Sequence, residues 1–308
     1  MSALVDRWMA LSPNLRGILW VALSGLVFAL LNVFTLIPAR HLNPYTMAFL
    51  RYFFGALFLL PLVMRLGLAR SLTTNRIGLH VSRGAIHTVG MMLWFVALPL
   101  TTLAEITALG FTGPIFVTIG AALFLREDVR LRRWLAVIVG FIGAMIIIRP
   151  GFSSLHIGVV CILLSTPIFS ASNLISKALA RTDSANTIVI WQNIVIVICA
   201  APAAFWFWQT PSWTDLLWFL AAGLCGTLGH LCQQRGYQLA DITLLQPIGF
   251  LSLIWNTLLG YFLFFQTPDV WTFVGAAVIF GSALYISHRE AVRRAQIKTA
   301  DSKASPES

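Results

Sequence analysis

The feature that most constrains this chain is a series of ten long apolar stretches separated by short polar segments. Each holds about 17 to 24 residues, and at about 1.5 Å per helical residue that length crosses a hydrocarbon layer of about 30 Å. Because 58% of the 308 residues are hydrophobic and only 10% are charged, the chain is far more apolar than a soluble domain. We therefore predict an all-α integral membrane protein with ten transmembrane helices. The expected spans are Gly17–Ile37, Pro44–Met64, Gly84–Leu100, Leu103–Leu125, Leu131–Ile148, Gly158–Ser176, Thr187–Trp208, Leu216–Gln233, Ile242–Phe265 and Val270–Ser287.

The positions of Lys and Arg indicate how these spans are oriented. Short cytoplasmic loops are enriched in basic residues, and with the N-terminus inside, all but three of the 21 fall in cytoplasmic segments. The exceptions are Arg40 and Arg149 on the outer side and Arg51 within the second span. We expect a multi-pass protein of the cell (inner) membrane with both termini cytoplasmic. This distribution also explains the net charge of +10, so no nucleic-acid partner is expected.

The two halves of the chain are weakly similar to each other. An offset of 141 residues aligns several polar positions, among them Ser24 with Ser165 and Asn32 with Asn173. An amide inside an apolar helix is energetically costly, so its recurrence at one position of both halves is informative. We predict two five-helix repeats, residues 17–149 and 158–287, followed by a polar cytoplasmic tail at 288–308.

An odd number of spans in each half predicts that the second half enters the membrane from the opposite side. Inverted repeats support two states of similar energy, each open to one side, with a substrate site between the halves. The sequence therefore favours a secondary transporter of small polar metabolites, which a proton gradient could drive. A membrane enzyme would need a nucleophile with a base, a metal cluster or a carboxylate pair, and a channel would need a filter. We find none of these patterns, expect no enzyme activity and no cofactor, and keep a non-transporting scaffold as the alternative from another class.

The chain resembles the ten-helix permeases of the drug/metabolite transporter superfamily, which carry two EamA domains. The residues that carry the resemblance are Asn43-Pro44 to Arg51-Tyr52, Phe124 to Glu127, Trp134 to Gly143 and, in the second half, Trp271 to Gly281. Arg83-Gly84, Gly90-Met91 and Trp94 look like a branch that includes S-adenosylmethionine and riboflavin uptake carriers. Gln266 departs from the family, which often has Glu before the last span.

The resemblance implies two antiparallel helix baskets around a central cavity lined by spans one, three, four, six, eight and nine. It also implies a homodimer contact at spans five and ten. The expected partners are a small-molecule substrate, the lipid bilayer and a second copy of the chain.

Arg51 is the charged residue that most strongly suggests a substrate contact. An ionised guanidinium inside a span costs at least about 2.5–3.5 kcal/mol unless it is paired or hydrated. Arg51 either binds a substrate carboxylate or phosphate, or it pairs with Glu105 or backbone carbonyls and stabilises the fold. Its repeat equivalent is Gln192, which is neutral but still forms hydrogen bonds.

Two acidic residues occupy equivalent positions in the repeats. Glu105 lies near the outer end of the fourth span and Asp241 near the inner end of the ninth. Burial raises the pKa of a carboxyl group, so Glu105 could take up a proton outside and couple transport to the proton gradient. The alternative is an interfacial carboxylate that stays hydrated.

His80, Arg83 and His87 share one helical face, which Trp94 continues. Too few further ligands are present for a metal site, so none is expected. His87 either forms hydrogen bonds in the cavity or packs structurally, and Trp94 could stack on an aromatic or sulfonium group. The amides Asn32 and Asn173 either face the cavity or bridge helices. The predicted substrate-binding residues are Asn32, Arg51, His87, Trp94, Asn173, His230, Gln234, Gln246, Trp255 and Asn256, with Glu105 and Asp241 as coupling or gating residues.

Overall fold

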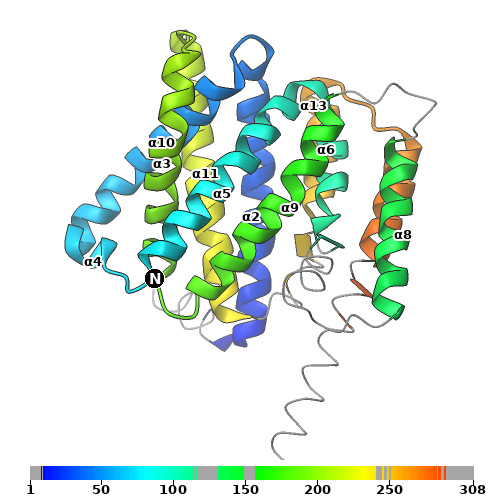
Figure 1. Ribbon diagram of the computed structural model, residues 1–308, viewed down its shortest axis with the longest axis horizontal. Helices are drawn as coiled ribbons and strands as arrows, with labels where there is room; N and C mark the ends of the chain where they lie inside the picture. Colours follow the sequence, from blue (N-terminus) through cyan, green and yellow to red (C-terminus); the bar gives the residue numbers. More distant parts are fainter. Residues whose placement is uncertain are drawn as a thin grey trace, which may run out of the picture.

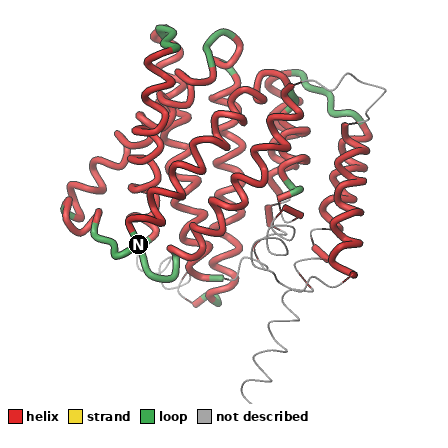
Figure 2. Tube along the Cα trace, in the orientation of Figure 1, coloured by secondary structure: helices red, strands yellow, loops and turns green. Residues whose placement is uncertain are grey.

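The computed structural model describes residues 8, 10–113, 115–116, 131–148, 157–240, 245, 248–249, 251–282, 284–285 and 288. Within these ranges all regular secondary structure is helical (Figure 2). This agrees with the all-α prediction. The predicted residues Asp241 and Gln246 lie outside the described residues.

Six of the described helices are long and apolar enough to span a membrane. They are α2 (Pro13–Leu36), α3 (Pro44–Leu66), α5 (Ile77–Ala97, extended by the 3-10 turn Leu98–Leu100), α9 (Ile157–Leu179), α10 (Ala185–Trp206) and α11 (Trp213–Leu239). Shorter apolar helices include α6 (Leu103–Gly110), α13 (Leu251–Phe264) and the segment Val270–Ser282, and α8 spans Leu131–Ile148. The chain is therefore a multi-pass membrane protein.

Short polar side chains cap several of these helices at their N-termini. Asn43 Oδ1 accepts a hydrogen bond from the Thr46 amide, and Pro44 occupies the first turn of α3, where a missing N–H is tolerated. Ser184 Oγ accepts in the same way from the Thr187 amide of α10. These caps explain why α3 begins at the predicted residue.

Helix α5 begins at Ile77, earlier than the expected start at Gly84. The expected boundary followed the first uninterrupted apolar run, which excluded His80 and Arg83. Both side chains are buried at 1% exposure, because they contact the second half of the chain rather than water. Their polarity therefore marks a contact between the halves and not a loop.

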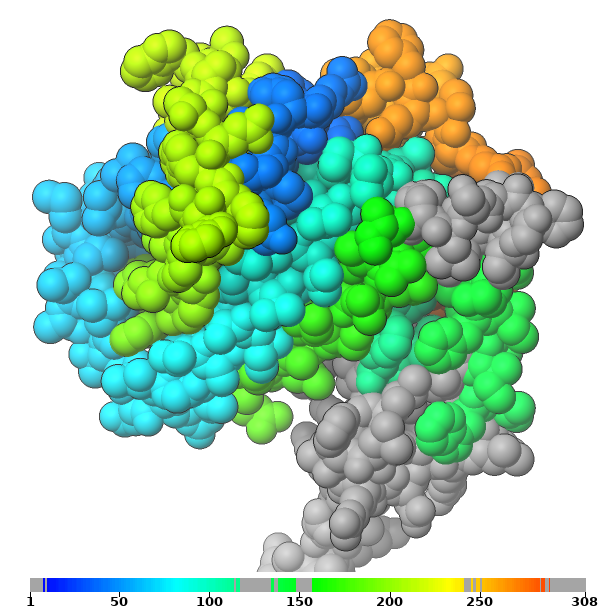
Figure 3. Space-filling view, turned by 45° about the horizontal axis from the view of Figure 1, so that its top comes forward, coloured from blue at the N-terminus to red at the C-terminus, as the bar shows by residue number. Residues whose placement is uncertain are grey.

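The six spanning helices form one bundle in which helices from the two halves alternate as neighbours (Figure 1). The most extensive contacts join α2 to α11, α5 to α9, and α3 to both α10 and α11. Figure 3 shows the yellow-green atoms of α10 between the blue and cyan atoms of the first half. The middle of the bundle is thus enclosed by both halves.

Glycines allow the closest of these contacts. A Cβ atom on Gly223 of α11 would lie 2.7 Å from the Gly55 nitrogen and 2.8 Å from Phe54 Cβ on α3. Small residues let helix backbones approach in a bilayer, where dispersion and hydrogen bonds, rather than the hydrophobic effect, drive helix association. Helix α8 meets the segment Val270–Ser282 in the same manner, since a Cβ on Gly143 would lie 2.9 Å from the Gly275 carbonyl oxygen.

We predict that Gly223→Val weakens the bundle, because the added carbons would overlap the α3 backbone. Overpacking of this kind costs about 1–3 kcal/mol, so the detergent-solubilised protein should melt several degrees lower. Gly78→Ala on α5 is the matched control, since a Cβ there meets nothing within 4 Å. An unchanged melting temperature for Gly223→Val would contradict the contact.

Candidate functional site

A cavity of about 280 Å³ lies in the middle of the bundle, close to the lower end of the usual range for small-molecule pockets. Its wall combines several aromatic rings with a few polar side chains from five spanning helices. The lining residues are Phe28, Leu31 and Asn32 of α2, Arg51 and Tyr52 of α3, His87, Met91, Trp94 and Phe95 of α5, Phe169 and Asn173 of α9, and His230 and Gln233 of α11. The family resemblance implied a wall from spans one, three, four, six, eight and nine. The described lining comes from spans one, two, three, six and eight.

Arg51 reaches across from α3 to α11 and is the cationic group of the cavity wall. Its guanidinium carbon lies 3.7 Å from the centroid of the Tyr52 ring, a cation–π contact. Gly226 makes room for it, because a Cβ there would overlap the guanidinium and lie 2.6 Å from its carbon. Arg51 is 5% exposed and forms no ion pair with any described residue, so the expected pairing with Glu105 is not observed.

His87 and His230 meet at the cavity wall, with ring centroids 5.6 Å apart. Both nitrogens of His87 have partners, since Nε2 lies 3.0 Å from the Tyr52 hydroxyl and Nδ1 lies 3.2 Å from Ser172 Oγ. His230 Nδ1 is buried and has no hydrogen-bond partner among the described residues. A substrate acceptor that reached it would satisfy this nitrogen.

Arg83 and Gln192 form a second buried polar group beside this wall. Arg83 Nη2 donates to Gln192 Oε1 at 2.8 Å, and Nη1 donates to the Ile188 carbonyl at 3.3 Å. Because the amide oxygen faces Arg83, the Gln192 amide nitrogen faces His230 Nε2, at 3.5 Å. Gln192 is the repeat equivalent of Arg51, and it binds a helix of the opposite half as Arg51 does.

The amides Asn32 and Asn173 both line the cavity, from α2 and α9. Asn32 Nδ2 donates to Asn256 Oδ1 at 2.9 Å, which leaves its own carbonyl oxygen available. Asn173 forms no hydrogen bond with another described residue. The pair therefore offers both donors and acceptors to a molecule in the cavity.

The other predicted residues lie at different distances from the cavity. Trp94 belongs to the wall, and Asn256 contacts it through Asn32. Gln234 is fully buried, and its Oε1 accepts from Ser176 Oγ at 2.8 Å, so it links α11 to α9 instead of lining the cavity. Trp255 is half-buried and is not among the lining residues.

Glu105 is part of a capping box at the start of α6. Its Oε2 accepts from the Thr102 amide at 3.0 Å and from the Thr102 hydroxyl at 3.1 Å. It does not line the cavity. These bonds give the carboxylate a structural role, and its predicted role in proton coupling stays a prediction. Among the described residues, no group of three or more His, Cys, Asp or Glu side chains could hold a metal ion.

Sequence reasoning missed most of the aromatic and aliphatic wall. Phe28, Phe95 and Phe169 line the cavity, but single apolar residues in apolar spans carry no signal of their own. Tyr52 and Gln233 could have been found, because they are polar residues next to Arg51 and Gln234 in the interior of spans.

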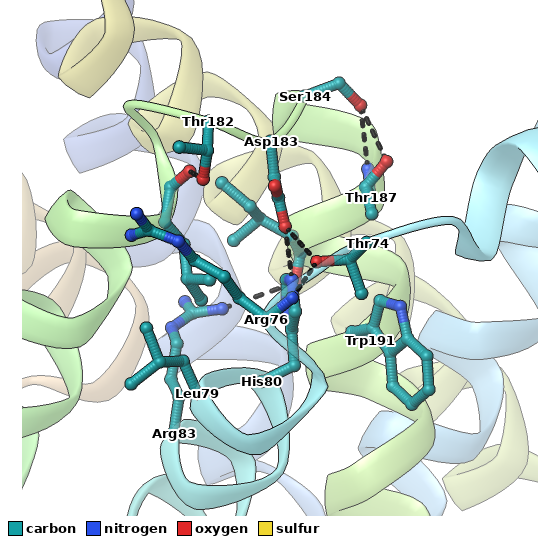
Figure 4. Close-up of polar contacts among 12 residues, drawn as sticks. Thr74, Arg76, Leu79, His80, Arg83, Thr182, Asp183, Ser184, Thr187 and Trp191 are labelled. Carbon is teal, nitrogen blue, oxygen red and sulfur yellow. Dashed lines mark hydrogen bonds and ion pairs between the residues drawn. The ribbon is translucent and has the colours of Figure 1, made fainter.

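His80 lies at one end of α5, seven residues before His87, and contacts the loop between α9 and α10 (Figure 4). His80 Nε2 and the Thr74 hydroxyl each donate to Asp183 Oδ2 at 2.7 Å. Desolvation raises the pKa of Asp183, but hydrogen bonds from Thr74, His80 and Thr182 outweigh it, so the pKa lies below the ordinary value of 3.8.

We predict that this contact contributes stability that is lost in acid. A carboxylate with a lowered pKa stabilises the folded state fully above its unfolded pKa, and the contribution disappears as pH falls through the folded pKa. The melting temperature of the wild type should therefore decline below about pH 4, and Asp183→Asn should decline less. Thermal unfolding in detergent between about pH 6 and 3 measures this, with Gln238→Ala as a control that should keep the wild-type decline. Equal slopes for the wild type and Asp183→Asn would contradict it.

Taken together, spanning helices around an internal cavity with convergent polar groups define a membrane carrier for small molecules. The model of the EamA-like transporter family matches residues 15–149 and 156–288, which is most of the chain. The protein belongs to this family, and the resemblance stated from its sequence is confirmed.

Characterised relatives cover nearly the whole chain. The S-adenosylmethionine uptake transporter of Rickettsia prowazekii is 28% identical over 91% of this chain and 95% of its own. The riboflavin transporter of Rhizobium johnstonii is 34% identical over 89% and 91%, and that of Vibrio cholerae is 31% identical over 90% and 94%. A crystal structure with 17% identity shares the fold, with a TM-score of 0.63 over 90% of this chain and 98% of the other.

We predict that Gly226→Ala impairs transport although it removes no polar group. The added methyl group would push the Arg51 guanidinium off α11 and change its position in the cavity. A misplaced charge-assisted hydrogen bond is worth about 1.5–3 kcal/mol, which is about tenfold or more in apparent affinity. Proteoliposome transport measures this, with Gly110→Ala as the control because a Cβ there meets nothing within 4 Å. Wild-type transport by Gly226→Ala would argue against a role for the position of Arg51.

Proposed function

We propose that this protein is a secondary transporter that carries a small metabolite with a planar ring system across the inner membrane by alternating access. The observation that carries the proposal is the cavity wall, which combines Arg51 with aromatic rings and contains no carboxylate among its described residues. Such a wall favours a neutral or anionic molecule whose ring stacks on aromatic side chains.

The architecture we propose is ten spans in two inverted five-helix repeats, residues 17–149 and 158–287, with both termini in the cytoplasm. The two stretches matched by the family model support this division. The interleaving of α2, α3 and α5 with α9, α10 and α11 supports it as well, since inverted repeats place their site between the halves. The contact of α8 with Val270–Ser282 leaves the apolar side chains of Leu135, Ile138 and Ile142 exposed, and we assign this face to the predicted homodimer.

Riboflavin is the first candidate substrate. It is uncharged, its tricyclic ring carries carbonyl acceptors and an imide N–H, and its side chain carries hydroxyl groups. Arg51 and His230 Nδ1 would donate to ring acceptors, and the amides of Asn32 and Asn173 would pair with donors and acceptors along the molecule. The riboflavin transporters among the relatives support this assignment.

S-adenosylmethionine is the second candidate, because relatives that carry it cover the chain equally well. Its carboxylate suits Arg51, and its sulfonium suits the rings of Trp94 or Phe169. It also carries an ammonium group, so its net charge near neutral pH is positive. A wall with Arg51 and no described carboxylate opposes that charge, which ranks this candidate below riboflavin.

We predict that riboflavin raises the melting temperature of the purified protein and that S-adenosylmethionine raises it less. A ligand at about 100 times its Kd stabilises the native state by about 2.7 kcal/mol. Arg51→Gln should reduce riboflavin affinity about tenfold or more, because it removes a charged donor, while Arg51→Lys should retain part of the affinity.

Fluorescence-independent thermal unfolding and uptake of labelled compound into proteoliposomes test this proposal together. Gly110→Ala serves as the control for handling and folding. A larger shift with S-adenosylmethionine would reverse the ranking, and wild-type affinity in Arg51→Gln would remove Arg51 from the site.

A further inference from the structure

Two His–Asp pairs connect the halves of the protein, one at each end of the bundle. His80 of the first half meets Asp183 of the second at 2.7 Å, and His41 of the first half meets Asp215 of the second at 3.0 Å. The loop that carries His41 lies at the end of the bundle opposite to the loops that carry Thr74 and Asp183 (Figure 1). Each pair therefore joins loops of opposite halves at its own membrane face.

The two pairs occupy equivalent places in the repeats. The offset of 141 residues aligns Thr74 with Asp215, and it aligns Leu42, the neighbour of His41, with Asp183. Asp215 thus corresponds to Thr74, which donates to Asp183. At each end, the loop between the first two long helices of one half contacts the region before the third long helix of the other half.

Further hydrogen bonds cross between the halves beside the outer pair. Gln209 Nε2 donates to the His41 carbonyl at 2.7 Å, and Gln209 Oε1 accepts from the Asn43 amide at 2.9 Å. The two ends differ in their exposure to water. The side chains of His80 and Asp183 are 0% and 8% exposed, whereas that of His41 is 55% exposed.

The cavity lies between these two contacts. His87 in the cavity wall follows His80 by seven residues of α5, which is about 10 Å along a helix. Arg51 in the wall lies a similar distance from Pro44, where α3 begins next to the His41 loop. A substrate that leaves toward either face must pass one of the two contacts.

We infer that Thr74, His80 and Asp183 form an inner gate and that His41 and Asp215 form an outer gate, which open in turn during transport. The inference rests on the proposed alternating access. Separation of the halves at one face requires the pair at that face to break, while the pair at the other face holds the halves together. Both gates are closed in this structure, and the cavity is enclosed between them.

Asp183→Asn should open the inner gate, because it removes the charge that accepts from both Thr74 and His80. His41→Gln should open the outer gate and leaves the capping box of Asp215 with Ser212 intact. The inner gate is the better shielded from water, so Asp183→Asn should produce the larger shift. Gln238→Ala is the matched control, since Gln238 Nε2 donates to the Asp183 carbonyl within the second half only.

The experiment measures the access of water to the cavity from each face. Met91→Cys places a reporter in the cavity wall, in a background where Cys161, Cys199, Cys225 and Cys232 are replaced by Ala. A membrane-impermeant maleimide is applied to right-side-out and inside-out vesicles. We expect Asp183→Asn to raise labelling from the face that carries Asp183 about fivefold or more and to lower it from the opposite face, with His41→Gln giving the reverse.

Thr74→Val provides a second inner-gate variant and should shift labelling in the same direction as Asp183→Asn by a smaller factor. Symmetrical labelling in all gate variants, or the same shift in Gln238→Ala, would overturn the inference. The labelling needs no substrate, so reciprocal shifts in a protein that transports neither riboflavin nor S-adenosylmethionine would keep the gates and reject the substrate assignment. Transport with no reciprocal shift would do the opposite.

Discussion

The close approach of α11 to α2 and α3 is the constraint on which the rest of the structure depends. Glycines at Gly223, Gly226 and Gly229 remove the Cβ atoms that would keep the helices apart, and side chains of the first half fill the space. Phe28 lies against Gly229, and the Arg51 guanidinium lies against Gly226. In a bilayer, where lipid chains solvate apolar side chains well, this close packing is a main source of helix association. It also places residues of both halves around one cavity.

The buried charges of the bundle are balanced without carboxylates in the described part of the membrane interior. Arg51 lies over the ring of Tyr52, and Arg83 is hydrogen-bonded to Gln192 and to the Ile188 carbonyl. Carbonyl and aromatic partners lower the free energy of a buried guanidinium but leave its charge in place. The cavity is consequently cationic, which sets a preference against cationic substrates. The acidic residues that contact histidines, Asp183 and Asp215, lie instead at the two ends of the bundle.

Much of the site could be predicted from the sequence, because polar residues are costly inside apolar spans and so are few. Asn32, Arg51, His87, Asn173 and His230 stand out for this reason, and all of them line the cavity. The same reasoning selected Gln234, which bonds to Ser176, because composition does not distinguish an amide that faces a cavity from one that bridges two helices. It also selected Glu105, which caps α6, since a carboxylate near a helix start satisfies the same pattern.

The sequence by itself determined the membrane-spanning character of the chain, the similarity of its two halves and the short set of polar positions within the spans. Each follows from local properties: the length of apolar runs, the spacing of equivalent residues and the energetic cost of a polar group in lipid. Only the tertiary structure decided which partner each polar group takes. His80, Arg83 and His87 share one helical face, yet they contact Asp183, Gln192 and Ser172 respectively. These partners come from the other half of the chain, more than 80 residues away, and helix packing brings them together in a way that no local pattern encodes.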